Sequence, residues 1–418
     1  MSQSYDLAIV GGGAAGLMAA IAAAQEAEGN RRKIKIVVLE GNSRIGKKLL
    51  ATGNGRCNLT NLLVSKEHYH GDVSCLDLML KEYTPQHILA RFESLGLLCR
   101  EREEGRVYPY SLQASAVLDV LRYQLDRYGI EIVCDFTVTK IQRDAKRFVL
   151  ASAQDGICAE RVILATGGMA YPQLGANGSG YKVIESLGHR IVKPYPALVQ
   201  LKTDPKRAKP LKGARNSAEA ALLINGKQVK TVSGEVQFTE NGLSGICIFE
   251  LSRVAGENLP LQRVEVSLDL MPEYSEQQIF LFLKNRKQGL QTLPTAELLS
   301  GMVNKLVGAE IIRQTLPHSP KLARELQLKE LSAVANAVKN FIFPVTGTLS
   351  WKDAQVTAGG VSLSEVDENL QSEFCPGLYL AGELCNIDGD CGGYNLHWAW
   401  SSGIQAGRAA AKSLMEQR

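Results

Sequence analysis

The stretch Leu7-Ala8-Ile9-Val10-Gly11-Gly12-Gly13-Ala14-Ala15-Gly16 decides the fold of this chain. Its first four residues are apolar and predict a buried strand, and the alanine-rich run that follows predicts a helix. Gly11, Gly13 and Gly16 therefore lie where a strand passes into a helix. Glycine there permits a tight turn, close approach of a pyrophosphate, and close packing of the helix on the strand. The stretch predicts a dinucleotide-binding unit whose helix N-terminus faces the phosphates.

A second strand supports this interpretation. Ile34 to Leu39 form an apolar run that ends at Glu40, a carboxylate in the position that accepts hydrogen bonds from an adenosine ribose. The alternative is an ordinary strand-to-helix turn with incidental glycines, which is common for an isolated match. Because strand, helix, second strand and acid are all present, we favour the nucleotide site.

Length and composition limit the class of protein. A chain of 418 residues with 45% hydrophobic residues exceeds what one core usually holds, so two or three domains are expected. The net charge of +4 is too small to indicate nucleic acid as the main partner. We find no signal peptide and no run long enough to span a membrane. Nine cysteines without C-x-x-C spacing suit reduced thiols. These features predict a cytoplasmic protein with no membrane partner.

The segment from Gly46 to Asn61 is rich in glycine, cations and amides, as expected of a loop that wraps a dinucleotide. Lys48 and Arg56 could face a pyrophosphate, and Asn58 could bond a ribityl chain or a ring edge. A solvated surface loop is the alternative that composition alone leaves open. Cys57 has no second cysteine nearby, which favours a packed thiol over half of a redox-active pair.

The chain divides into three parts by its pattern. The sequence predicts further strands of the same sheet at 130–133, 137–141, 147–150 and 162–164. The last of them runs into Thr166-Gly167. Ligands collect at the carboxyl ends of such strands, where the first glycine turn and Glu40 also lie. The pattern predicts a Rossmann-like α/β dinucleotide-binding domain over 1–192, and the chain returns to the same pattern over 342–418. Between them lie a β-rich domain over 193–273 and a mostly helical stretch over 274–341, which is either a third small domain or an appendage of the β-rich one.

Local signals within the middle part predict its elements. Asn225-Gly226 predicts a hairpin turn, Ser275 with Gln278 a helix-capping box, and Ser319-Pro320 a helix start. A basic run could touch phosphates, but without interleaved aromatic residues a solvated loop is favoured. The run comprises Lys202, Lys206, Arg207, Lys209, Lys212 and Arg215.

The C-terminal part returns to the pattern of the first. Gly377 to Glu383 form a strand that ends in a glycine and an acid, and residues 388–395 precede a helix over 396–415. The glycines at that helix start could hold the pyrimidine edge of a flavin and stabilise negative charge in the reduced ring. A third nucleotide element of this kind is needed by FAD rather than by NAD.

These motifs together resemble the BaiN/YhiN-like flavoproteins, relatives of the two-dinucleotide-binding-domain FAD enzymes. The resemblance implies a discontinuous Rossmann-like FAD-binding domain, over 1–192 and 342–418, interrupted by a β-rich, barrel-like domain and a small helical domain. The resemblance rests on the glycine turn with Glu40, the loop 46–61, residues 165–168 and 356–361, and Gly382 to Gly403. Cys391 stands where a threonine is expected, and Asn386 where an acid is frequent. Motifs and resemblance together imply non-covalent FAD held by Gly11, Gly13, Ala15, Gly16, Glu40, Lys48, Arg56, Asn58, Val138, Thr166, Gly167, Gly382, Glu383, Gly392, Gly393, Tyr394 and Asn395.

The resemblance implies an oxidoreductase but leaves three functions open. The first is an FAD-dependent reductase of an enone-type small molecule, with NADH or NADPH as a transient donor. The second is an amine oxidase that uses oxygen, and the third a non-catalytic FAD protein tied to RNA. No second G-x-G-x-x-G motif marks a nicotinamide domain, and no metal site is predicted. His397, Tyr394, Cys391 and Tyr171 are the candidate acids or bases, although a packed role is more usual for a lone histidine such as His397.

Overall fold

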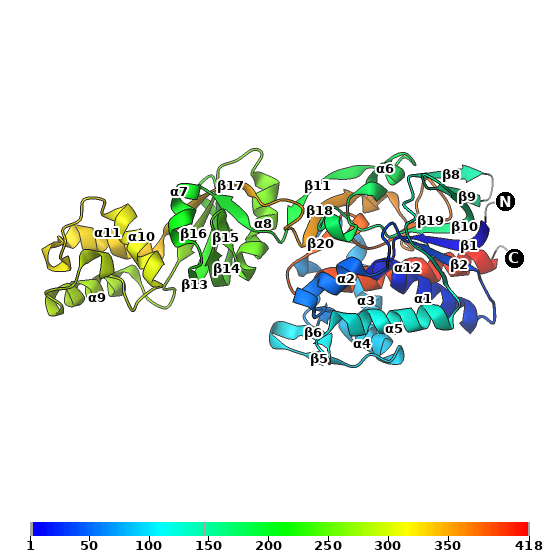
Figure 1. Ribbon diagram of the computed structural model, residues 1–418, viewed down its shortest axis with the longest axis horizontal. Coiled ribbons are helices and arrows are strands. Elements are labelled where there is room, and N and C mark those ends of the chain that lie inside the picture. The colour runs from blue at the N-terminus through cyan, green and yellow to red at the C-terminus, as the bar shows by residue number, and fades with distance from the viewer. Residues whose placement is uncertain (1–2, 145–146, 417–418) are drawn as a thin grey trace. The chain divides into compact units, whose positions relative to one another are not determined.

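The computed structural model describes residues 3–144 and 147–416, and the chain forms two compact units (Figure 1). The first comprises residues 1–195 and 355–418, and the second comprises residues 196–354. None of the helices in the described residues combines the length and apolar character that a membrane crossing needs.

A mainly parallel sheet forms the centre of the first unit. Its strand order is β7-β2-β1-β10-β9-β8, and β19 pairs with the carboxyl end of β10. Strands β1, β2, β7, β10 and β19 run parallel, whereas β8 and β9 are antiparallel additions at one edge. The strands are β1 Gln3–Val10, β2 Ile36–Leu39, β7 Glu131–Val133, β8 Lys140–Asp144, β9 Arg147–Ala151, β10 Gly156–Leu164 and β19 Leu378–Leu380. The strand expected over 137–141 begins only at Lys140. The Rossmann-like α/β prediction is confirmed.

Two helices from opposite ends of the chain pack tightly together in this unit: α1 Ala14–Gly29 and α12 Tyr394–Glu416 (Figure 1). A Cβ at Gly403 would lie 2.5 Å from the Ala15 carbonyl oxygen, and one at Gly407 2.3 Å from that of Ala19. Glycine therefore allows α12 to touch the backbone of α1. The other helices are α2 Lys47–Ala51, α3 Leu76–Glu82, α4 Pro85–Ser94, α5 Ala114–Arg127 and α6 Ser179–Glu185.

Small sheets tie distant segments to this frame. Strand β4 Tyr69–Gly71 pairs antiparallel with β20 Ile387–Gly389. A second small sheet has the order β3-β6-β5, and a third joins β11 to β18. These strands are β3 Thr60–Asn61, β5 Cys99–Glu101, β6 Arg106–Pro109, β11 Ile191–Ala197 and β18 Val356–Val361. The pairings bring the loop after the second strand to the segment just before α12.

A closed barrel of order β12-β15-β14-β13-β16-β17 forms the second unit. Its long hairpin, β13 to β14, turns at Asn225-Gly226 as predicted. The strands are β12 Leu201–Thr203, β13 Arg215–Ile224, β14 Lys227–Phe238, β15 Gly242–Ser244, β16 Val264–Asp269 and β17 Phe341–Thr348. The predicted return to the nucleotide domain at residue 342 is wrong, because β17 closes the barrel and the second unit extends to Ala354.

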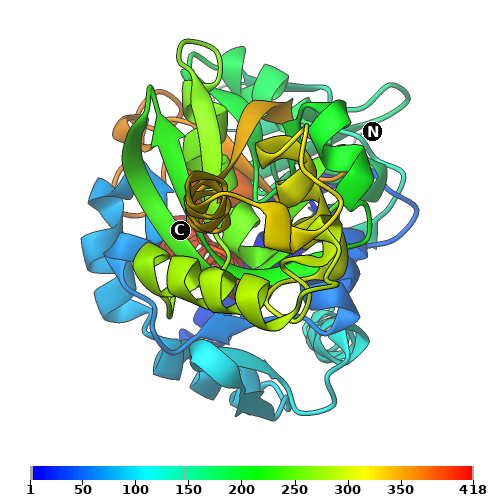
Figure 2. The ribbon, with the colours of Figure 1, turned by 90° about the vertical axis from the view of Figure 1, so that its left-hand side faces the viewer.

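The helical segment lies beside the barrel strands (Figure 2), and the two share one hydrophobic core. Its helices are α9 Glu276–Gly289, α10 Lys305–Thr315 and α11 Leu328–Lys339, whereas α7 Pro205–Ala208 and α8 Ile246–Asn258 lie between barrel strands in the sequence. Helix α9 begins with the predicted capping box of Ser275 and Gln278. The predicted helix start at Ser319-Pro320 is wrong. That segment is extended because the Pro320 and Lys321 carbonyls accept hydrogen bonds from the Thr295 hydroxyl and amide.

Candidate functional site

The glycine turn after β1 is tightly packed at Gly11 and Gly16 and open at Gly13. Gly11 has a φ of 111°, and a Cβ at Gly16 would lie 1.9 Å from the Gly11 carbonyl oxygen. At Gly13, by contrast, a Cβ would meet nothing within 4 Å. The Leu17 amide donates to the Gly13 carbonyl, and the amides of the preceding first turn, which have no acceptor within a helix, could donate to a ligand. Ala15, a predicted contact, is one of those preceding residues.

Glu40 lies against this turn and is buried. Its Oε2 accepts from the Gly12 amide at 2.8 Å, and its Oε1 accepts from the Asn42 amide at 2.8 Å and side chain at 2.7 Å. The Phe136 amide donates to the Glu40 carbonyl at 2.9 Å, which brings buried Val138 to the same strand end. Glu40 therefore both shapes the turn and presents a carboxylate there. Asn42 was not anticipated from the sequence.

The segment 46–61 contains helix α2 rather than loop alone. Lys48 forms an ion pair with Glu383 at 2.6 Å, with both side chains about a quarter exposed. Asn58 Oδ1 is buried and has no hydrogen-bond partner among the described residues. Arg56 is exposed. Cys57 is fully buried, and burial raises the pKa of its thiol to about 12, which supports a packed role.

Thr166 and Gly167 follow the carboxyl end of β10. Thr166 Oγ1 is buried and, within the described part of the chain, makes no hydrogen bond. Gly167 has a φ of 72°. Thr357 fixes the next residues, because its hydroxyl accepts from the Met169 amide at 2.8 Å and the Ala170 amide at 3.1 Å. The Thr357 backbone amide donates a hydrogen bond to the Glu383 carboxylate at 3.0 Å. Its role was not predicted, since no local pattern links it to residue 169.

The start of α12 meets the segment 58–61. Gly392 and Gly393 have φ values of 134° and 102°. A Cβ at Gly393 would lie 2.5 Å from the Thr60 carbonyl oxygen and 2.9 Å from Asn58 Oδ1. Asn61 donates to the Gly392 carbonyl at 2.9 Å. Only a residue without a side chain allows this approach, so the two glycines bring the C-terminal helix to Asn58.

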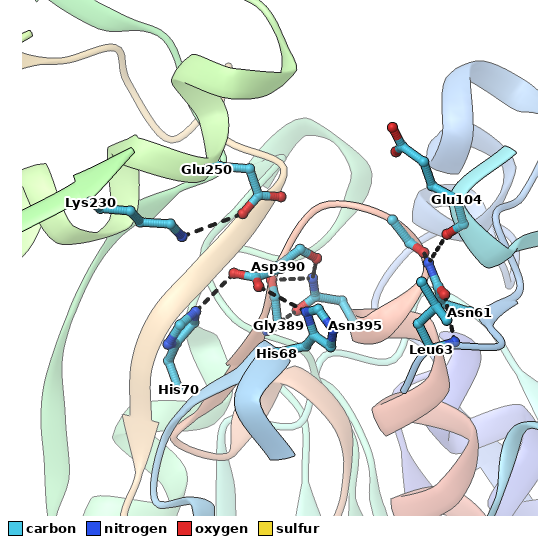
Figure 3. Close-up of polar contacts among 11 residues, drawn as sticks. Asn61, Leu63, His68, His70, Glu104, Lys230, Glu250, Gly389, Asp390 and Asn395 are labelled. Atoms are coloured by element: carbon cyan, nitrogen blue, oxygen red, sulfur yellow. Dashed lines mark hydrogen bonds and ion pairs between the residues drawn. The ribbon is translucent and has the colours of Figure 1, made fainter. Parts of the chain in front are cut away.

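Gly382 and Asn395 complete the C-terminal contacts and are held within the protein. The Gly382 amide donates to Ser402 at 2.9 Å, and its carbonyl accepts from the Trp398 indole at 3.0 Å. The Asn395 side chain exchanges two hydrogen bonds of 2.8 Å with the Gly389 backbone (Figure 3). Asn395 therefore stabilises the turn before α12.

The candidate acids and bases differ in how far they could serve chemistry. His397 is fully buried; its Nε2 donates to the Tyr83 carbonyl at 2.9 Å, so Nδ1 accepts from Thr60 at 2.8 Å. Burial lowers the pKa of His397 to about 4. It is a packed histidine in the neutral form. Tyr394 is buried, Tyr171 lies in the left-handed region with a φ of 60°, and Cys391 is half-buried.

A cluster that the sequence did not predict lies beside the glycines. His68 Nδ1 and His70 Nε2 lie 3.2 Å and 2.9 Å from the two oxygens of Asp390 (Figure 3). The His68 ring also stacks on Tyr394 at a centroid distance of 4.3 Å. The histidines are two residues apart on or beside β4, and residues at this spacing face the same side of a strand. The pairing of β4 with β20 brings them to Asp390.

The arrangement fits the adenosine, diphosphate and ring parts of a flavin dinucleotide. An open helix N-terminus at Gly13 suits a diphosphate. Two buried oxygens, of Asn58 and Thr166, lack partners among the residues described and would be satisfied by a bound polar group. Among the same residues, no group of histidine, cysteine and acidic side chains could hold a metal ion.

Comparison with known proteins bears on this site. The family described as HI0933-like protein Rossmann domain matches residues 5–409. The chain belongs to this family. It is an FAD-dependent oxidoreductase by class, in agreement with the prediction.

Two named relatives are similar to this chain over nearly their whole length. A 3-dehydro-bile acid delta(4,6)-reductase from Clostridium scindens is 38% identical over 97% of this chain and 99% of its own. A ribosomal RNA dihydrouridine synthase from Haemophilus influenzae is 27% identical over 96% of this chain and 97% of its own. Among solved structures, a 3-ketosteroid delta1-dehydrogenase from Sterolibacterium denitrificans is 14% identical over 99% of this chain and 100% of its own, with a TM-score of 0.50. At that identity the structure shows a shared fold alone.

Proposed function

We propose that this protein reduces a carbon–carbon double bond conjugated to a carbonyl group in a small organic substrate, with non-covalent FAD and with NADH or NADPH as the donor. The observation that carries the proposal is the full-length similarity, at 38% identity, to a reductase named for a 3-dehydro-bile acid. The glycine turn, the two buried oxygens without partners and the glycine-rich start of α12 support it.

The residues that would hold the cofactor come from three parts of the first unit. The Gly13 turn and the amides of α1 would receive the diphosphate, and Glu40 the adenosine ribose. Asn58, Thr166 and Gly393 would contact the ribityl chain and ring. FAD, when bound, supplies the hydride chemistry that no protein side chain provides. The full set proposed is Gly11, Gly13, Ala15, Gly16, Glu40, Lys48, Arg56, Asn58, Val138, Thr166, Gly167, Gly382, Glu383, Gly392, Gly393, Tyr394 and Asn395.

The two named relatives support one reaction class rather than two. A 3-dehydro delta(4,6) bile acid and the uracil base of a uridine both contain a double bond conjugated to a carbonyl group. Reduction of either places a hydride on one carbon and a proton on its neighbour. A shared site for this chemistry is consistent with the similarity of this chain to both.

The charge of the second unit favours a small molecule over RNA as the substrate. Three cations of its six-residue basic run are engaged within the unit. Arg207 donates to the Gln314 amide oxygen at 2.9 Å, and two others pair with carboxylates, Lys212 with Glu240 at 2.7 Å and Arg215 with Glu235 at 3.4 Å. Cations already paired with carboxylates release fewer counterions from a phosphate backbone. RNA is therefore the second candidate, motivated by the 27% identical relative.

An anaerobic experiment tests the proposal. Purified yellow protein is mixed with NADH, with NADPH or with amines, and the flavin absorbance near its visible maximum is followed. The reduced protein is then mixed with a 4-en-3-one steroid, with a ribosomal RNA transcript, or with buffer. We expect a nicotinamide to bleach the flavin and the steroid to restore its colour. Bleaching by amines but not by nicotinamides would instead identify an amine oxidase, and reoxidation by RNA alone would identify an RNA substrate.

A further inference from the structure

His68, His70 and Asp390 form a polar cluster outside the set of residues proposed to hold the cofactor. The Asp390 amide donates to the His68 carbonyl at 2.9 Å, which extends the pairing of β4 and β20 by one residue. This backbone contact places the Asp390 carboxylate against both imidazoles (Figure 3). The carboxylate side chain is 19% exposed, and the His68 and His70 side chains are 33% and 25% exposed. The cluster is therefore rigidly placed yet accessible.

We propose that His68 is the acid that protonates the substrate, and that Asp390 positions it. The inference rests on the function proposed above and names the proton donor of that reaction. His68 directs Nδ1 to Asp390, which leaves Nε2 as the ring nitrogen without a partner among the described residues. A carboxylate on Nδ1 orients an imidazole so that its other ring nitrogen faces the substrate, as in acid–base dyads. Stacking on Tyr394, with ring planes 18° apart, holds the ring orientation.

His70 is the less suitable of the two histidines. Its Nε2 binds Asp390 at 2.9 Å, so only Nδ1, the nitrogen nearer the backbone, is left for a substrate. Its side chain is also the less exposed. We assign His70 the role of a second donor to Asp390, which keeps the carboxylate in place.

The position of the cluster links it to the cofactor contacts. Asp390 directly precedes Cys391, Gly392 and Gly393. Gly393 lies against Asn58, whose buried oxygen lacks a partner within the described chain, and Gly392 accepts from Asn61. Tyr394, on which His68 stacks, begins α12. The acid therefore contacts the segment 390–394, which also carries residues proposed to hold the ring.

The reduced FAD of the proposed function would supply both electrons for the reduction of the substrate. The β-carbon of the conjugated system takes a hydride from the reduced cofactor, and the π pair of the double bond moves to the α-carbon. The α-carbon takes the proton from His68 Nε2, and the exposed imidazole recovers a proton from water. The substrate gains two electrons and two hydrogen atoms, and the cofactor returns to its oxidised form.

The test separates the two half-reactions in the full-length holoprotein. Asp390→Asn and His68→Gln are compared with wild type, with His70→Gln, and with His318→Gln, an exposed histidine of the second unit, as the control. Each protein is reduced anaerobically with dithionite and mixed with a 4-en-3-one steroid in a stopped-flow instrument. We expect flavin reoxidation to fall about 10²-fold or more in Asp390→Asn and His68→Gln, the usual contribution of a general acid. The visible flavin spectrum, the FAD affinity and the rate of reduction by NADH or NADPH should remain those of wild type.

Each contrary outcome has a distinct meaning. Unchanged reoxidation in both variants overturns the role of the cluster. An equal loss in reduction and reoxidation, or a loss of FAD, makes it a cofactor-holding element and also overturns the inference. A loss in His70→Gln but not in His68→Gln overturns the choice of His68. Wild-type protein that no enone reoxidises overturns the proposed function itself, and the inference with it.

Discussion

Glu40 uses both carboxylate oxygens within the protein before any ligand is considered. The Gly12 amide and the Asn42 amide and side chain all donate to it. At this scale, a single residue can shape the nucleotide turn and also contact the nucleotide. The two roles are separable, because one is measured by stability and the other by affinity.

Replacement of Glu40 by alanine should affect both quantities. We expect Glu40→Ala to weaken FAD binding by roughly 1.5 to 3 kcal/mol, the range for hydrogen bonds to a charged group. The apoprotein should also melt at a lower temperature, because the buried Gly12 amide loses its acceptor. Fluorescence titration with FAD and thermal unfolding of the apoprotein measure the two effects. Glu40→Gln is the matched control, and unchanged FAD affinity in the alanine variant would mean that the ribose lies elsewhere.

His397 should make the protein less stable in acid. Its folded-state pKa of about 4 lies below the ordinary value, so the unfolded chain binds the proton more readily. This contribution is fully present above the unfolded pKa of about 6.5 and declines as the pH falls toward the folded value. Between pH 7.5 and 5 we expect a loss of about 2 kcal/mol from this residue.

Urea unfolding at the two pH values checks that expectation. His397→Gln has no titrating group and should show a smaller loss between pH 7.5 and 5 than wild type. Equal losses in the two proteins would show that His397 carries a proton in the native state, contrary to its burial between the Tyr83 carbonyl and Thr60.

Cys57 should resist alkylation in the native protein. Its thiol is fully buried and has a pKa raised to about 12, so little thiolate forms at pH 8. Mass spectrometry after treatment with iodoacetamide should find Cys57 unmodified when native and modified when unfolded in urea. Rapid labelling of the native protein would contradict the burial and restore the redox interpretation.

At the scale of elements, the contact between α1 and α12 depends on two glycines. A Cβ at Gly407 would lie 2.3 Å from the Ala19 carbonyl oxygen, and one at Gly403 2.5 Å from that of Ala15. The neighbouring atoms belong to helix backbone and have little room to move. Spacing between the two helices is therefore set by the absence of side chains on one face of α12.

Alanine at Gly407 should separate the helices and destabilise the first unit. We expect Gly407→Ala to lower the free energy of unfolding by about 1 to 3 kcal/mol, the usual cost of overpacking. Gly29→Ala is the matched control, because a Cβ there meets nothing within 4 Å. It should be neutral or stabilising by up to about 1 kcal/mol. Thermal unfolding of both variants measures these effects. An unchanged free energy of unfolding in Gly407→Ala would show that the two helices can separate without loss of stability.

Elements with a local signal could be predicted, and those made by distant pairing could not. The glycine turn, the Asn225-Gly226 hairpin and the Ser275 capping box each depend on neighbours in sequence. Barrel strand β17 was assigned to the wrong part, since its partners β12 and β16 lie far back along the chain. The His68 and Asp390 contact spans 322 residues and has no local pattern that could have indicated it.

At the scale of the whole molecule, the second unit is a continuous segment with its own core. Barrel strands and helices α9 to α11 share that core. We expect residues 196–354, expressed alone, to fold cooperatively and to bind no flavin, because every proposed cofactor contact lies in the first unit. Circular dichroism during thermal unfolding and visible absorbance after addition of FAD test this. A yellow fragment would move part of the flavin site into the second unit.

The close packing of α1 against α12 also has a consequence for biosynthesis. Helix α1 leaves the ribosome early, but its partner is encoded after the whole second unit, residues 196–354. At roughly 5 to 20 residues per second, translation of that insert takes on the order of 10 to 30 s. During this time the apolar face of α1 has no final partner, while the barrel can already fold. Nascent chains stalled before α12 should therefore engage chaperones and capture no flavin.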